Sequence, residues 1–177
     1  MLAPILTSFL KVAIPLAAVG AILFFSKRKG ISWEEVLGFK KPGLAAAAGW
    51  IAVWVVVVIC EEFLIRKLGM DQAKQWPEMP LPLLILKILA LGFAGPLAEE
   101  TIMRGMALGR LRQTRLGEFG AIAVCAAIWA VMHYNYGAST VAMIAFDGVI
   151  LGLARTRGGS LWIPIMMHML GNCFSVV

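Results

Sequence analysis

Charged side chains are scarce in this chain, and their scarcity excludes most kinds of water-soluble domain. Only 15% of the 177 residues are Asp, Glu, Lys or Arg, whereas 60% are hydrophobic, and the mean hydropathy is +0.85. A soluble domain of this length needs more polar surface than these residues provide. We therefore expect one polytopic membrane domain that covers residues 1–177.

Cysteine is also rare, and its spacing gives no zinc-ribbon or redox motif. Cys60, Cys125 and Cys173 lie within apolar segments and form no C-x-x-C pair, so we expect small buried side chains. The net charge is +6, but the basic residues gather at the ends of apolar runs, as membrane topology signals do. This pattern favours a lipid bilayer as the partner and argues against nucleic acid. The first apolar run lacks the features of a signal peptide, and we expect it to be retained.

Several apolar stretches approach the length of about 20 residues that a membrane-spanning helix needs. They predict an all-α bundle of about six transmembrane helices, at residues 4–25, 43–61, 82–103, 118–135, 138–154 and 160–177. Residues 30–42 are typical of a short amphipathic segment at the membrane interface. We divide the chain into N-terminal helices at residues 1–81 and a core at residues 82–177, which carries the polar motifs.

The basic residues predict the orientation of these helices, because cytoplasmic loops carry an excess of Lys and Arg. Most of them fall in the first, third and fifth loops: Lys27, Arg28, Lys29, Lys40, Lys41, Arg110, Arg112, Arg115, Arg155 and Arg157. These loops are expected in the cytoplasm, which leaves both termini outside.

Both histidines of the chain, His133 and His168, lie in apolar stretches, and a third such stretch carries Glu99, Glu100 and Arg104. An ionisable group inside a membrane is costly and therefore marks a functional site. With a rise of ~1.5 Å per residue, Glu99 would lie ~18 Å, His133 ~22 Å and His168 ~12 Å from the cytoplasmic ends of their helices. The sequence therefore predicts that the three motifs meet in one site within the bundle.

The spacing of the acidic motif separates the two glutamates. Glu100 and Arg104 are four residues apart, so they share a helix face and should form an ion pair. Glu99 points about 100° away from that face and is left free for chemistry. The range Glu61–Arg66 repeats the same pattern, but we interpret it as the interfacial end of a helix.

The remaining polar residues suit the hydrolysis of an amide. That reaction needs a base that activates water and hydrogen-bond donors that stabilise the oxyanion. Glu99 with His133 suits the first task, and His168 with Asn172, four residues later, suits the second. Asp147 lies in the middle of the fifth apolar stretch, where we expect it to support a histidine or the motif arginine.

Three segments resemble the CPBP family, the CAAX-processing and bacteriocin-processing intramembrane endopeptidases that include the Ras-converting CAAX protease. They are residues Gly95–Gly105, Trp129–His133 and Ser160–Asn172. The resemblance covers roughly residues 82–177. Trp129 stands where the family usually has phenylalanine, and Met103 where it usually has an aromatic residue.

The resemblance implies an intramembrane endopeptidase of a bacterial or archaeal plasma membrane, acting on a membrane-associated or lipidated protein or peptide. It implies the following site residues: Glu99 and His133 to activate water, His168 and Asn172 to stabilise the oxyanion, and Glu100 with Arg104 as a supporting pair. This glutamate mechanism requires no cofactor. Zinc bound by Glu99, His133 and His168 stays open on ligand type, although no zinc-protease spacing of histidines is present.

Two other functions use the same residue types. A transporter or proton-relay protein would be expected to show inverted-repeat symmetry, which the sequence lacks. A catalytically silent binding member, such as a bacteriocin-immunity factor, would be expected to have lost part of the polar set, which is complete here.

Overall fold

The computed structural model describes residues 2–68 and 79–174, which form helices joined by short turns, with no strand among them. The α-helices are α1 (Leu2–Arg28), α2 (Leu44–Lys67), α3 (Leu81–Leu89), α4 (Gly95–Glu100), α5 (Leu108–Leu111), α6 (Gly117–Val131), α7 (Ala138–Gly158) and α8 (Trp162–Phe174). π-Helical turns lie at Trp33–Leu37, Ala90–Ala94 and Thr101–Ala107, and a 3₁₀ turn lies at Tyr134–Tyr136. The predicted all-α class is confirmed.

The helices have the length and surface of a membrane bundle. Within the described residues, four segments are long and apolar enough to cross a membrane: Ala3–Arg28, Leu44–Lys67, Leu81–Leu111 and Ala138–Gly158. The other two helices are shorter, since α6 has 15 residues and α8 has 13; the predicted end of the last helix, residues 175–177, lies outside the described part. Large apolar side chains such as Ile14, Val56 and Phe63 are exposed. The protein is an integral membrane helix bundle.

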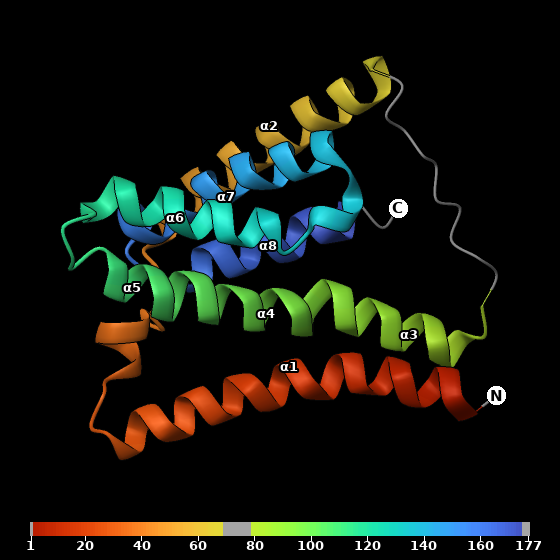
Figure 1. Cartoon of the computed structure of the whole chain (residues 1–177), viewed down its shortest axis with the longest axis horizontal. Helices are drawn as coiled ribbons and strands as arrows, with labels where there is room; N and C mark the ends of the chain where they lie inside the picture. Colours follow the sequence, from red (N-terminus) through yellow and green to blue (C-terminus); the bar gives the residue numbers. More distant parts are fainter. Residues whose placement is uncertain (1, 69–78, 175–177) are drawn as a thin grey trace.

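The long helix from α3 to α5 lies between α1 and the rest of the bundle (Figure 1). It packs against α1 on one side and, through α4, against α8 on the other; α6 packs along α7, and α2 contacts both α7 and α8. The turn after α1 and the turn between α5 and α6 lie at the same end of the bundle (Figure 1). These two turns carry many of the basic residues, as the orientation argument expects; which side of the membrane they face stays a prediction.

Glycines allow α7 to pack closely against α6. A Cβ atom at Gly148 would lie 2.9 Å from the Cα of Ala126, and one at Gly152 would lie 2.9 Å from the Cγ2 of Ile122. Small residues at a helix interface let backbones approach, which matters in lipid because burial itself gives little driving force there. The two helices thereby fix the position of the motif at the end of α6.

Half of the predicted interfacial segment, residues 30–42, is packed into the protein. Trp33 is exposed, but Leu37 and Gly38 are buried. The carbonyl of Gly38 accepts a hydrogen bond from the N–H of Leu161 at 2.7 Å, and Arg155 donates to the carbonyl of Leu37 at 3.3 Å. The second half of the segment therefore closes one end of the bundle, and only its first half suits a membrane surface.

Among the helix ends that differ from the sequence-based prediction, two change the placement of polar residues. α2 continues beyond the predicted end at residue 61 to Lys67, because the apolar residues that follow the acidic pair extend its hydrophobic surface. α6 ends at Val131, before the predicted end at residue 135. The N–H of His133 then bonds to the carbonyl of Ala130 in a turn, and Gly137, with φ +87°, redirects the chain. His133 therefore lies just beyond its helix.

Candidate active site

The two adjacent glutamates of the acidic motif lie in α4, between two widened turns of the long helix. The N–H of Gly95 bonds to the carbonyl of Ala90, five residues back, and the N–H of Leu108 bonds to Met103 in the same way. Such π-helical turns are rare and occur frequently at functional sites. Together they set the direction in which each glutamate leaves the helix.

A proline in the first of these turns connects the motif helix to α8. In the register set by Gly95, the next N–H would bond to the carbonyl of Leu91, but Pro96 has no N–H to donate. Asn172 takes its place, because its Nδ2 donates to the carbonyl of Leu91 at 2.7 Å. A freed backbone group in a membrane must find another partner, so Asn172 has a structural task beside any catalytic one.

The supporting pair is formed as the four-residue spacing predicts. Arg104 Nη1 donates to Glu100 Oε1 at 2.9 Å, and the same oxygen lies 3.0 Å from Nδ1 of His168. Arg104 Nη2 donates to the carbonyl of Gly148 at 3.2 Å. Both side chains of the pair are fully buried. A buried arginine or glutamate destabilises an apolar bundle when its partner of opposite charge is removed.

Glu99 points away from this pair, also as predicted, toward Trp129 on α6. Its Oε2 accepts a hydrogen bond from Trp129 Nε1 at 2.7 Å. Nδ1 of His133 lies 2.8 Å from the carbonyl oxygen of Trp129. Because a carbonyl only accepts, Nδ1 must carry the proton, and Nε2 of neutral His133 is left with a lone pair.

Sequence reasoning assigned no contact to the indole of Trp129, which lies at the centre of the site. The guanidinium carbon of Arg104 lies 4.6 Å from the centre of the indole ring. The rings of His133 and His168 meet the same indole edge-to-face, with centroids 5.5 Å and 5.2 Å away. The one available signal was the departure from the phenylalanine of the family pattern.

Five of the six predicted site residues are connected to one another directly or through Trp129, while Asn172 bonds to the backbone of the long helix. The six residues divide by exposure. Three are partly exposed: Glu99, His133 and Asn172. Three are buried: Glu100, Arg104 and His168. The first group is the more accessible to a substrate, whereas Glu100 and Arg104 of the second group hold charge inside the bundle.

The proposed zinc ligands do not fit a metal ion in this geometry. Among the residues that the structure describes, no three His, Cys, Asp or Glu side chains are grouped so that they could hold one. The Nδ1 atoms of His133 and His168 and one oxygen of Glu99 have other partners, so only the two Nε2 atoms and the second Glu99 oxygen are left as possible ligands. The set Glu99, His133 and His168 is therefore not assembled as a metal site.

The interpretation of the second acidic motif is half wrong. Glu62 pairs with Arg66 at 2.6 Å on an exposed surface, as expected of a helix end. Glu61 is partly buried instead, and its carboxyl group contacts that of Asp147 on α7. Asp147 also interacts electrostatically with Arg104, so the predicted support for that arginine is indirect. Glu61 was misplaced because α2 does not end there.

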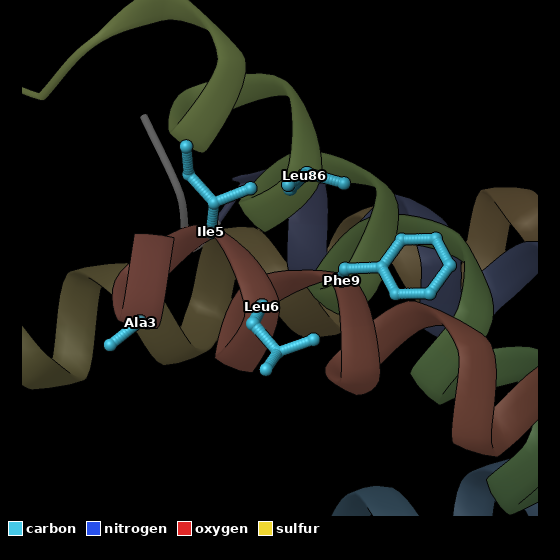
Figure 2. A pocket seen from close by; sticks show the side chains of 5 residues that line it. All are labelled: Ala3, Ile5, Leu6, Phe9 and Leu86. Atoms are coloured by element: carbon cyan, nitrogen blue, oxygen red, sulfur yellow. The ribbon is translucent and has the colours of Figure 1, made fainter. Parts of the chain in front are cut away.

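An apolar groove lies apart from this network, between α1 and α3. It has a volume of about 490 Å³ and is lined by Ala3, Ile5, Leu6, Phe9 and Leu86 (Figure 2). Its lining carries no ionisable side chain, so it offers no group for hydrolysis.

The glutamates, the arginine and the histidines form a polar cluster inside an apolar helix bundle. The protein is therefore of the class of membrane proteins that have a buried polar centre. The chain belongs to the family of Rce1-like type II CAAX prenyl endopeptidases, whose model matches residues 81–174. The matched range begins at α3 and contains all six predicted site residues, so the suspected family is confirmed. At the level of the family, the protein is a CAAX-type intramembrane protease.

One curated relative is similar over most of the chain. An "Uncharacterized 24.3 kDa protein" of Escherichia coli is 30% identical over 152 residues, which cover 83% of this chain and 70% of that protein. No solved structure gives a significant match.

Proposed function

We propose that the protein is an intramembrane endopeptidase in which Glu99 activates water to hydrolyse a peptide bond of a membrane-associated or lipidated protein. The observation that carries the proposal is the contrast between the two glutamates. Glu100 is fully buried between Arg104 and His168, whereas Glu99 is partly exposed, and among the described residues only one of its oxygens accepts a hydrogen bond. Only the second arrangement leaves a carboxylate available as a base.

His133 suits the task of orienting the water. Because its Nδ1 donates to the carbonyl of Trp129, its Nε2 lone pair can accept a hydrogen bond from a water between the two helices. The ring stacks against Tyr136, with centroids 5.6 Å apart, which limits its rotation. A water held by a carboxylate and an imidazole would be fixed in position before it attacks.

The oxyanion has two candidate donors on α8. An amide nitrogen carries two N–H groups, and Asn172 uses one of them for the carbonyl of Leu91. The other can face the substrate oxygen. His168 directs Nδ1 to Glu100, so its Nε2 can donate a hydrogen bond only when both ring nitrogens carry a proton.

The reaction then balances without a further co-reactant. The water oxygen forms a bond to the carbonyl carbon while Glu99 takes one of its protons. The electron pair of the carbonyl moves to the oxygen, where Asn172 and His168 stabilise the charge. When the tetrahedral intermediate collapses, the carbon–nitrogen bond breaks and Glu99 returns the proton to the leaving amine.

Membership in a protease family favours this function over a transporter or a proton relay. The complete polar set argues against a catalytically silent binding protein. The substrate is proposed as a class, membrane-associated or lipidated proteins, because the family is named for prenylated CAAX proteins.

The proposal is tested by mass spectrometry of membrane peptides from cells that carry wild type or Glu99→Gln, together with cleavage of a farnesylated CAAX peptide by purified protein in vesicles. Truncated peptides should be present with wild type and absent with Glu99→Gln, and turnover should fall by at least ~10²-fold. Glu62→Gln is the matched control, since it removes a carboxylate from the same motif pattern at an exposed position. Equal cleavage by wild type and Glu99→Gln would refute the proposal.

A further inference from the structure

Trp129 contacts the reacting glutamate, the motif arginine and both histidines from a single buried side chain, which is 5% exposed. Its Nε1–H bonds to Glu99, its carbonyl accepts from His133, and its ring lies against Arg104 and His168. We propose that Trp129 is the positioning residue of the active site and that its indole N–H sets the orientation of the Glu99 carboxylate. This inference rests on the function proposed above.

The indole N–H determines which oxygen of Glu99 is available for chemistry. A carboxylate has two equivalent oxygens and rotates freely unless one of them is held. The bond of 2.7 Å from Trp129 occupies Oε2. Oε1 is then the oxygen nearest to Gly95, where a Cβ atom would come within 3.7 Å of it. The missing side chain at Gly95 thus leaves space beside the oxygen that would accept the proton of the water.

The same residue connects this orientation to His133. The carbonyl of Trp129 fixes the tautomer of the imidazole, while the indole fixes the carboxylate. Trp129 therefore holds both groups that would bind the water, and its ring is in turn packed against the buried Arg104. A phenylalanine at this position would keep the backbone carbonyl and an aromatic face but would lose the N–H donor.

The chain contains a matched control in Trp54, another buried tryptophan. Trp54 is 3% exposed and packs against Gly171 on α8, where a Cβ atom would lie 3.0 Å from its Cζ2. Its Nε1 is buried without a hydrogen-bond partner among the described residues. Trp54→Phe therefore removes similar core volume without removing a hydrogen bond.

The experiment compares Trp129→Phe with Trp54→Phe in vesicles, using the farnesylated CAAX peptide, and measures kcat, KM and the melting temperature of each variant. Trp129→Phe should lower kcat by about 10-fold to 100-fold, the range for a hydrogen bond to a charged group, with KM unchanged. Trp54→Phe should lower the melting temperature to a similar extent and leave kcat within about 2-fold. A third variant carries β-(3-benzothienyl)alanine at position 129, which keeps the shape of indole and replaces only its N–H. It should repeat the loss in kcat without the loss in stability.

The outcomes separate this inference from the proposed function. If Glu99→Gln cleaves as fast as wild type, the proposed function fails, whatever the tryptophan variants do. If Glu99→Gln is inactive while Trp129→Phe and the benzothienyl variant keep the kcat of Trp54→Phe, the proposed function stands and the role of Trp129 is overturned. A loss in Trp129→Phe that the benzothienyl variant does not share would also overturn it, because the ring and not the N–H would then be responsible.

Discussion

Replacing Glu100 by glutamine tests whether the buried ion pair holds the site together. The carboxylate oxygen Oε1 meets two donors, Arg104 at 2.9 Å and His168 at 3.0 Å, and both side chains of the ion pair are fully buried. Glutamine keeps an oxygen of the same shape but removes the negative charge. Arg104 is then left as an uncompensated cation in an apolar bundle.

The expected loss can be worked out from these contacts. Removing one partner of a buried ion pair costs about 3–5 kcal/mol. The lower end applies here, about 3 kcal/mol, because the amide oxygen still accepts a hydrogen bond and Arg104 keeps its bond to Gly148. For a chain of this length, that loss lowers the melting temperature by roughly 6–12 °C.

The assay is thermal unfolding of purified variants in one detergent, with Glu62→Gln as the control. Glu62 and Arg66 have side chains 52% and 71% exposed, and such a pair contributes under about 1 kcal/mol. A double variant, Glu100→Gln with Arg104→Met, should recover most of the loss, because it removes the stranded charge as well. If Glu100→Gln melts no lower than Glu62→Gln, the reasoning about the buried pair is refuted.

Three further predictions concern other parts of the bundle. Gly38→Ala should lower the stability by more than Gly30→Ala. Both glycines have positive φ, which costs an alanine about 1–2 kcal/mol, but only at Gly38 would the Cβ atom also overlap Arg155. Equal melting temperatures of the two variants would contradict this. Asp147→Asn should leave the melting temperature unchanged or raise it, since an amide N–H can donate to the facing carboxylate of Glu61; a loss as large as that of Glu100→Gln would show that the carboxyl of Asp147 is required. Cleavage in detergent should survive chelators, because no three ligands are grouped to hold a metal among the described residues; activity that is lost with chelator and restored by zinc would show that this is wrong.

The pairing within one helix and the meeting of the motifs in one site could be predicted from the sequence, but the individual contacts between helices could not. The pairing of Glu100 with Arg104 follows from the spacing of four residues, which is a property of any α-helix. The bond from Trp129 to Glu99 joins side chains 30 residues apart. Its existence depends on how α6 and α4 are placed, and no local pattern encodes that placement.

The errors in helix length have a common cause. Apolar runs were taken as helices, so the acidic residue Glu61 was taken as an end, and residues 132–135, which follow an apolar run, were taken as its continuation. In the structure, the helical hydrogen bonds of α2 continue past its acidic pair to Lys67, and those of α6 end at Val131. A helix in lipid ends where its backbone turns, and hydropathy alone does not report that position.

The two π-helical turns of the long helix have a consequence for how its length can vary among related genes. A π-helical turn holds one residue more than an α-helical turn, so a single-codon deletion within Ala90–Ala94 or Thr101–Ala107 could be absorbed by a return to ordinary α-helix. In a regular helix, the same deletion would rotate everything beyond it by about 100°. Because α4 lies between these two turns, the glutamates could keep their direction while the helix gains or loses a residue on either side. Homologous genes would then be expected to differ in length at these turns and to agree between them.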